Sequence, residues 1–133
     1  VVCLAPMVRA GTLPLRLLAL EYGADLVWSE EIVARKMAGC RRIEHPRGTV
    51  DFVAKGGNVV FQTSPAERGK CIFQVGAADG CEAWEACRSV CGDIAAVDIN
   101  MGCNKHSAVA GGHGTALCSD PDKTRDVIKT LTR

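Results

Sequence analysis

Short apolar runs alternate with stretches of helical periodicity along most of the chain. The apolar runs predict buried strands at residues 1–5, 25–28, 71–76 and 94–99. Between them, apolar side chains three or four positions apart predict helices that end at Gly23, Gly39 and Gly92. This repeated order of strand and helix predicts an α/β fold with a parallel sheet and right-handed crossovers.

A last helix is predicted from a start signal near the end of the chain. Ser119-x-x-Asp122 resembles a capping box, and Pro121 suits the first helical turn. The helical spacing predicts a buried face made of Thr124, Val127, Ile128 and Leu131. Before this helix, a long glycine-rich connection runs from residue 100 to residue 117.

The middle of the chain departs from the alternation of strand and helix. Residues 49–53 and 58–62 are strand-like and flank the turn Lys55-Gly56-Gly57, which predicts a β-hairpin. Residues 65–69 follow as a polar loop. Apart from this hairpin, two architectures fit the pattern, an open doubly wound sheet and part of a (β/α)8 barrel. A complete barrel takes about 250 residues, so 133 residues are close to half of one.

Composition is that of an ordinary globular protein and narrows the picture in only a few respects. Apolar residues make up 47% and charged residues 23%, with a net charge of +1 that does not by itself indicate a nucleic-acid binder. No apolar run approaches the roughly 20 residues of a membrane span, and no signal peptide is visible. The chain starts within an apolar run and stops at the end of a helical pattern, so we expect a partial sequence.

Eight cysteines are an unusually high number for a chain of this length. Several lie within predicted strands and helices, Cys3, Cys71, Cys87 and Cys91 among them, where a reduced thiol packs as a small hydrophobe. No Cys-x2-Cys pair of the kind that binds zinc occurs, and we expect no metal. The sequence therefore predicts free thiols and a cytoplasmic location, with the nucleus as the alternative.

Candidate chemistry gathers in the loops that follow the predicted strands, because both architectures place their active sites there. Cys103 follows the fourth strand in a glycine-rich loop, where a partly exposed thiol is able to donate a proton or act as a nucleophile. His106 and His113 share this loop, so a Cys–His pair stays open. Gln74 ends the third strand, where it is an ordinary polar rim residue or a hydrogen-bonding group for a ligand.

Three other features have ordinary explanations beside functional ones. The glycine-rich turn at 111–114 precedes a helix and is a candidate phosphate cradle, although it lacks a complete phosphate-binding motif. Glu30 and Glu31 are expected to supply acidic charge to a helix N-terminus. The basic stretch from Arg35 to Arg47 is expected to be a solvated surface, with contacts to phosphates as the alternative.

An ordered set of motifs at these strand ends resembles the tRNA-dihydrouridine synthases, in particular the eukaryotic branch that acts on position 20. The motifs run over essentially the whole chain: Leu4-Ala5-Pro6-Met7-Val8-Arg9-x-Gly11-Thr12-Leu13-Pro14-x-Arg16, Tyr22-Gly23-Ala24-Asp25, Phe73-Gln74-x-Gly76, Asp98-x-Asn100-Met101-Gly102-Cys103 and Ser119-Asp120-Pro121-Asp122-Lys123. Each motif alone is weak, but their order and spacing together are specific.

The resemblance implies the first four βα units of a (β/α)8 TIM barrel, with the β-hairpin inserted between units 2 and 3. Residues 1–133 would then be the N-terminal half of an FMN-binding barrel domain, whose C-terminal half and helical tRNA-binding domain are not in this sequence. Such a half carries two open sheet edges. We expect it not to reduce tRNA by itself.

The family reaction reduces a uridine of the tRNA D-loop to 5,6-dihydrouridine, with NADPH as the reductant of FMN. By motif, the resemblance implies that Cys103 is the proton donor and that Asn100 and Lys105 bind the substrate. It implies that Pro6, Met7, Val8 and Gln74 bind the flavin. The target base has to leave its stack to reach this site.

Two positions depart from the family pattern. Asn104 replaces the usual proline after the cysteine, and Ala110 replaces a basic residue before Gly111. These departures and the expected absence of half of the barrel keep open a second hypothesis, a truncated non-catalytic homologue that acts as a binding or interaction module. A third, a different FMN barrel oxidoreductase such as a dihydroorotate dehydrogenase relative, is disfavoured by the Met-Gly-Cys loop and the Ala-Pro-Met-Val start.

Overall fold

A parallel sheet forms the centre of the computed structural model, which describes residues 1–132; Arg133, the last residue of the predicted domain, lies outside them. Its main strands are β1 (Cys3–Leu4), β2 (Leu26–Trp28), β7 (Cys71–Gly76) and β8 (Ala96–Ile99), paired in the order β1-β2-β7-β8. A short strand, β3 (Ile32–Val33), pairs with the end of β7 beyond β2. The predicted α/β fold with a parallel sheet is therefore confirmed.

The apolar pattern of the strands matches their position in this sheet. All six residues of β7 are buried, because the strand has a neighbour on each side and helix α3 (Gly80–Val90) over one face. The outer strands β1 and β8 each pair on one side only within residues 1–132, as expected of two open edges. Cys3 of β1 is exposed, so the expectation that it packs in the core was wrong.

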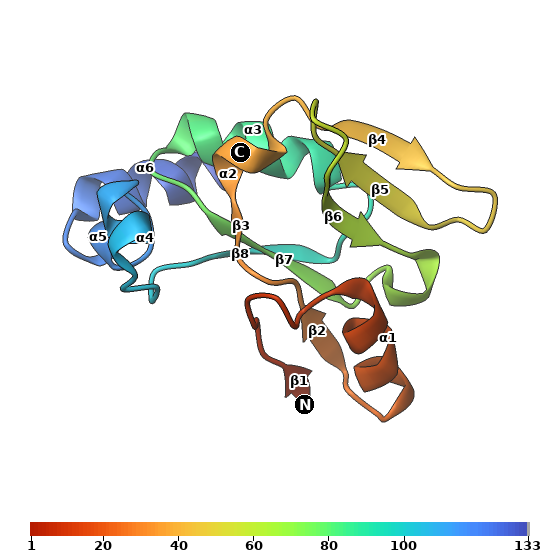
Figure 1. Cartoon of the computed structure of the whole chain (residues 1–133). Helices are drawn as coiled ribbons and strands as arrows, with labels where there is room; N and C mark the ends of the chain where they lie inside the picture. The colour runs from red at the N-terminus through yellow and green to blue at the C-terminus, as the bar shows by residue number, and fades with distance from the viewer. Residues whose placement is uncertain (133) are drawn as a thin grey trace.

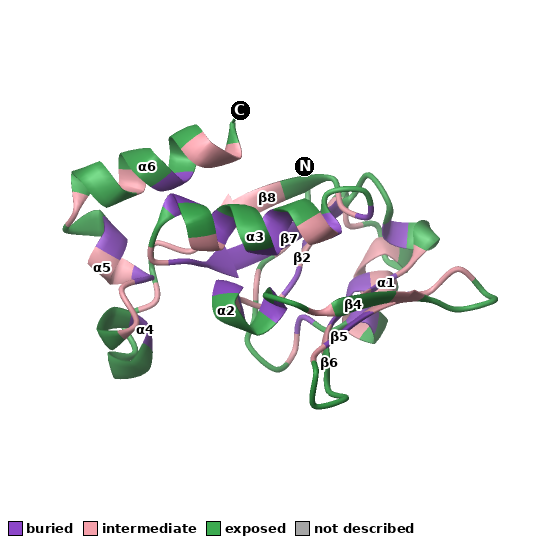
Figure 2. Cartoon of the chain, turned by 90° about the horizontal axis from the view of Figure 1, so that it is seen from above, coloured by how far each residue is buried: buried purple, intermediate pink, exposed green. Residues whose placement is uncertain are grey.

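Four helices in residues 1–132 follow strands as predicted, namely α1 (Leu13–Glu21), α2 (Ala34–Met37), α3 and α6 (Pro121–Leu131). Two more, α4 (His106–Ala110) and α5 (Thr115–Cys118), lie where a glycine-rich connection without a helix was expected. Helix α1 packs on β2, and α6 packs on α3 at the outside of the molecule (Figures 1 and 2). No helix in the described part of the chain has the length and apolar character needed to cross a membrane.

Two details of the last helix differ from the prediction. Its N-cap is Asp120, whose carboxylate accepts the backbone N–H of Lys123, and Ser119 is one position too early. Pro121 does occupy the first turn. Val127 is fully buried, but Ile128 is 45% exposed, because α6 contacts the rest of the fold along a narrower stripe than the apolar spacing indicates.

A second, antiparallel sheet lies beside the parallel one, at the end opposite α4, α5 and α6 (Figures 1 and 2). The predicted hairpin is confirmed as β5 (Val50–Val53) and β6 (Val59–Thr63). A third strand, β4 (Arg41–Glu44), pairs with β5 and falls in the basic stretch that we expected to be solvated surface. The insertion is thus a three-stranded accessory sheet, and the predicted polar loop contains a 3-10 turn, η1 (Pro65–Glu67).

Aromatic packing joins the two sheets. The ring of Phe61 in β6 stacks on Phe52 of β5, with centroids 5.8 Å apart, and meets Phe73 of β7 edge-on at 5.1 Å. Such pairs contribute about 0.5–1.5 kcal/mol beyond the burial of their surface. The accessory sheet is therefore part of the same hydrophobic core as β7.

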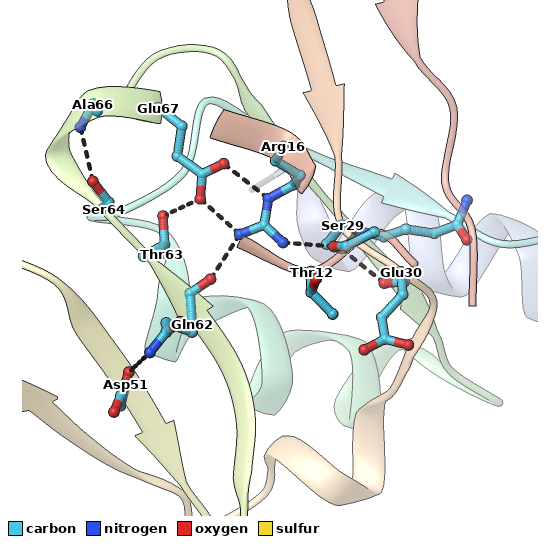
Figure 3. Close-up of polar contacts among 12 residues, drawn as sticks. Thr12, Arg16, Ser29, Glu30, Asp51, Gln62, Thr63, Ser64, Ala66 and Glu67 are labelled. Carbon is cyan, nitrogen blue, oxygen red and sulfur yellow. Dashed lines mark hydrogen bonds and ion pairs between the residues drawn. The ribbon is translucent and has the colours of Figure 1, made fainter. Parts of the chain in front are cut away.

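A buried ion pair between Arg16 of α1 and Glu67 of η1 is the second link between the sheets (Figure 3). The Arg16 guanidinium donates two hydrogen bonds to the Glu67 carboxylate, from Nε to Oε2 at 2.8 Å and from Nη2 to Oε1 at 2.7 Å. It also donates to the carbonyl oxygens of Gly11 and Gln62. Burial opposes the charge, yet the hydrogen bonds and charge of Glu67 raise the pKa of Arg16 above its ordinary value. The Thr63 hydroxyl donates to the same carboxylate.

A second arginine–carboxylate pair fastens the accessory sheet to the turn before β8. Arg42 of β4 donates two hydrogen bonds of 2.8 Å to Asp93. These hydrogen bonds lower the pKa of Asp93 below its ordinary value, because they stabilise the ionised carboxylate. The Asp93 side chain is 8% exposed and that of Arg42 is 40% exposed, so the pair lies at the boundary between core and solvent.

Replacing Arg16 by methionine should destabilise the fold strongly. Removing one partner leaves the fully buried Glu67 carboxylate without its counter-charge, which costs about 3–5 kcal/mol of unfolding free energy. Urea denaturation measures the loss, and Arg47→Met, at an exposed arginine without an ion pair in the described part of the chain, is the control. Equal stability of the two variants would contradict this role for Arg16.

Replacing Asp93 by asparagine should weaken the fold at neutral pH and flatten its response to acid. A lowered pKa in the folded state adds stability above the unfolded value of 3.8, and this stability is lost as the pH falls through the folded pKa. We expect a loss of about 1 kcal/mol at pH 7 for a partly exposed pair. The measurement is urea denaturation from pH 7 down to about pH 3, with the exposed Asp122→Asn as the control. An unchanged acid limb in Asp93→Asn would exclude this pair as its source.

Candidate functional site

The loops that follow the parallel strands meet at one edge of the sheet. The backbone N–H of Arg9, after β1, donates to Glu30 Oε2, after β2, at 2.8 Å. Glu31, from the same loop as Glu30, pairs with His113, which lies beyond β8. The four loops predicted to share a rim therefore do so, and their polar groups are directly linked.

Ser29 interrupts the strand between β2 and β3 and ties it to the centre of the sheet. Its hydroxyl accepts the backbone N–H of Gln74 at 2.9 Å and donates to the Glu30 carbonyl at 2.8 Å. The strand pairing with β7 resumes at Ile32. This break turns the two glutamates toward the rim instead of continuing the ladder.

A chain of side-chain hydrogen bonds runs along the rim from β7 to the loop after β8. Gln74 Nε2 donates to Asp98 Oδ2 at 2.6 Å, and Asn100 Nδ2 donates to Gln74 Oε1 at 3.1 Å. Asn100 Oδ1 in turn accepts the backbone N–H groups of Gly102 and Cys103, at 3.2 and 2.9 Å. Three predicted site residues, Gln74, Asn100 and Cys103, are thus brought together, and Gln74 is buried where an open rim position was expected.

Cys103 is held by its backbone on both sides. Its backbone N–H donates to Asn100 Oδ1 at 2.9 Å, and its carbonyl oxygen accepts the N–H of Thr115, also at 2.9 Å. The thiol is partly exposed, as predicted. Within residues 1–132 no histidine hydrogen-bonds this thiol, and His113 pairs with Glu31, so the Cys–His alternative receives no support.

Exposure alone does not distinguish Cys103 from the other thiols. All eight cysteines are unbridged, and four are more exposed than Cys103, namely Cys3, Cys81, Cys91 and Cys118. Cys91 ends helix α3 and does not lie on its packed face as expected. Burial raises the pKa of Cys71 and Cys87 to about 12, which keeps both as neutral thiols at physiological pH.

The Glu31–His113 pair closes the rim between β2 and the loop beyond β8. Glu31 Oε1 lies 3.1 Å from His113 Nδ1, and both side chains are 9% exposed. Both pack on Gly76, where a Cβ would lie 2.6 Å from the carboxylate and 2.8 Å from the imidazole. The expectation that Glu30 and Glu31 serve a helix N-terminus was wrong, because their carboxylates bind Arg9 and His113 instead.

The glycine-rich turn after Cys103 has a packing role. Gly114 has a φ of +65°, and a Cβ on it would collide with the carbonyl oxygen of Cys103. Gly111 packs closely on the ring of His113. Close approach to neighbours thus explains these glycines without a bound phosphate.

Two spaces open beside this rim. A cavity of about 340 Å³ is lined by Cys103 and Lys105 together with Glu31, His113 and other residues. A larger groove of about 980 Å³ runs from Val8 and Arg9 past Lys105 to the β5–β6 turn. Of the predicted site residues, Val8 and Lys105 both line this groove, whereas Pro6 and Met7 line neither space.

Four polar residues link the loops of the rim, and the sequence did not predict this role for them: Ser29, Glu31, Asp98 and His113. Asp98 carried a signal, since it is the one acidic residue inside an otherwise apolar strand. The Glu31–His113 contact had none, because 82 residues separate its partners.

Comparisons with known proteins agree on one family. Residues 3–133 match the family described as dihydrouridine synthase (Dus). The chain is 44% identical to the NAD(P)+ tRNA-dihydrouridine(20) synthase of Saccharomyces cerevisiae and 43% identical to that of Schizosaccharomyces pombe, over 98% of its length. It is 34% identical to a human tRNA-dihydrouridine(20a/20b) synthase-like protein over 96% of its length. It spans only 36%, 28% and 36% of these relatives, about a third of each.

Gly114→Ala should move the loop that carries Cys103 without unfolding the protein. The added Cβ would meet the Cys103 carbonyl, and the positive φ adds strain. We expect a several-fold change in the rate at which iodoacetamide alkylates Cys103, followed by mass spectrometry of the digested protein. Gly69→Ala is the matched control, since its φ is +78° but no atom lies within 4 Å of the new Cβ. Equal alkylation rates in both variants would show that Gly114 does not set the Cys103 loop.

Proposed function

Because this chain belongs to the dihydrouridine synthase family, we propose that the protein reduces uridine in tRNA to 5,6-dihydrouridine. Position 20 of the D-loop is the proposed target, since the relatives at 43 and 44% identity carry that position in their names. The observation that carries the proposal is the linkage of Cys103, Asn100 and Gln74 at one strand-end rim. The thiol of Cys103 and the side-chain amides of Asn100 and Gln74 suit a reaction on a nucleobase beside a flavin.

The proposed architecture is the first four βα units of a (β/α)8 barrel. The strand order supports it, because β1, β2, β7 and β8 are neighbours in chain order without a reversal. A doubly wound sheet reverses its strand order at a switch point, and its ligand binds there. A barrel instead adds each strand beside the previous one and keeps its site on the carboxyl-end loops.

FMN is the proposed cofactor, and the residues at the rim are of the kinds that fit it. Met7 and Val8 are 40 and 50% exposed, which leaves apolar surface for a ring system. Gln74 uses one amide N–H and one lone pair within the rim, so one donor and one acceptor remain for the polar edge of a flavin. Pro6, in the same loop as Met7, completes the proposed contact surface.

When bound and reduced by NAD(P)H, the flavin supplies a hydride, which the uracil takes up at C6. Cys103 holds the proton that C5 takes up, and its thiol becomes a thiolate in that step. A positioned general acid of this kind contributes about 10²–10⁴-fold to a rate. The two backbone hydrogen bonds of Cys103 fix the position from which the thiol donates.

The proposed substrate residues are Asn100 and Lys105. Asn100 Oδ1 already accepts two backbone N–H groups, and Nδ2 gives one hydrogen to Gln74, so a single N–H remains for the uracil. Lys105 is exposed and lines the cavity that Cys103 also lines. This shared cavity supports a role for the Lys105 ammonium group in binding a phosphate or a base oxygen of the substrate.

The alternative, a non-catalytic homologue, rests on Asn104 and Ala110. A proline at position 104 would stiffen the loop after Cys103. The structure offers other restraints, since Asn100 and Thr115 hold the backbone of Cys103 from two sides. Asn104 therefore does not leave the thiol without a defined position, which favours the enzyme over the binding module.

Cys103→Ala in the full-length protein should lower dihydrouridine formation by about 100-fold or more, because the proton donor is lost. Bound flavin, followed by its visible absorbance, should be unchanged, because Cys103 is not among its proposed ligands. Cys91→Ala, at an exposed cysteine on the end of α3, is the control and should keep its activity. Retained activity in Cys103→Ala would remove Cys103 from this role.

A further inference from the structure

We propose that the groove between the accessory sheet and the rim binds the sugar-phosphate backbone of the substrate RNA. This rests on the proposed function, since it takes tRNA as the substrate. The groove has a volume of about 980 Å³. It would contact nucleotides that flank the target uridine, and it would do so independently of their sequence, because phosphate contacts position a nucleic acid without reading its bases.

Four segments that are distant in the sequence supply cations to this groove. Arg9 comes from the loop after β1, Lys36 from α2, Lys55 from the β5–β6 turn and Lys105 from the loop after β8. All four side chains are exposed. A fifth cation, Arg35, also lines the groove. The chain as a whole has a net charge of only +1, so this is a local concentration of positive charge.

The cations of the groove are largely uncompensated. Arg9, Lys36, Lys55 and Lys105 have no carboxylate within 4.0 Å anywhere in residues 1–132, and only Arg35 forms an ion pair, with Glu82. The groove also holds two carboxylates, Glu30 and Glu31, which hydrogen-bond the backbone of Arg9 and the ring of His113, so its cations outnumber its acids by five to two. The cationic side chains of the groove repel one another until an anion binds between them. A polyanion that neutralises several of them also releases its condensed counterions, which favours binding.

Arg9 is held in a conformation that the fold has to enforce. Its φ is +67°, and it is the one residue other than glycine with a positive φ among those that the structure describes. The hydrogen bond from its N–H to Glu30 fixes the turn in which it lies. Strain of this kind concentrates at ligand-binding positions, and here it presents an arginine at the mouth of the groove.

The groove leads to the proposed reaction site. It shares Glu31, Lys36 and Lys105 with the smaller cavity that Cys103 lines. A strand bound along the groove therefore reaches the thiol without crossing another surface. None of the lining residues is aromatic, so the groove lacks the anchors typical of a protein partner and suits a phosphate backbone better.

The test measures binding of unmodified tRNA to the full-length protein at a series of salt concentrations. Lys36→Glu and Lys55→Glu should each weaken binding several-fold. Each should also reduce the magnitude of the slope of log affinity against log salt by at least about 0.7–0.9, the value for one lost phosphate contact, because the substitution also adds a negative charge. With reduced flavin present, Lys55→Glu should raise KM for tRNA and leave kcat the same, since Lys55 lines the groove and not the cavity that Cys103 lines.

Lys70→Glu is the matched control, because Lys70 is equally an exposed lysine but precedes β7 at the end opposite the rim. Its log affinity for tRNA should depend on log salt with the same slope as that of the protein without substitutions. If Lys36→Glu and Lys55→Glu behave like Lys70→Glu while the unmodified protein makes dihydrouridine, the groove is not an RNA site. If their slopes fall while no dihydrouridine forms, the groove binds RNA and the proposed reaction is wrong.

Discussion

The buried guanidinium of Arg16 constrains the rest of the molecule more than any other single group. A full charge removed from water is stable only when its hydrogen-bonding positions are filled. Arg16 meets this requirement with Glu67 and with the carbonyl oxygens of Gly11 and Gln62. These partners belong to η1, the loop after β1 and strand β6, so one side chain fixes the accessory sheet relative to the loop that carries Met7, Val8 and Arg9. The two walls of the groove are thereby held in one arrangement.

The parallel sheet could be predicted from the sequence because each of its main strands is a short, continuous apolar run. An apolar run such as residues 71–76 is a strand wherever both of its faces are covered, and all of β7 is indeed buried. Strand β4 could not be found in this way. It is basic and mostly exposed, and it forms a strand only because β5 offers a partner and Asp93, 51 residues from Arg42, neutralises its charge. Tertiary partners of this kind leave no pattern in the sequence itself.

The site shows the same division. Cys103 and Gln74 were predicted because each follows or ends a strand, and the carboxyl ends of parallel strands meet at one edge, whereas Asn100 was implied by the family resemblance. The assignment of the remaining cysteines was less successful, since Cys3 and Cys91 are exposed although their surroundings in the sequence are apolar or helical. An edge strand and a helix end are open to solvent for reasons of topology, which periodicity does not encode.

The register between β7 and β8 is the physical origin of the rim. Gln74 and Asp98 are direct partners in this register, so the geometry of the ladder itself sets the hydrogen bond between their side chains. Asn100 follows two positions after Asp98, on the same face, where its amide reaches both Gln74 and the backbone of Cys103. A slip of one residue would turn Asp98 and Asn100 to the opposite face. The position of the thiol is therefore a consequence of strand pairing in the core, and the loop that carries it needs no proline to define it.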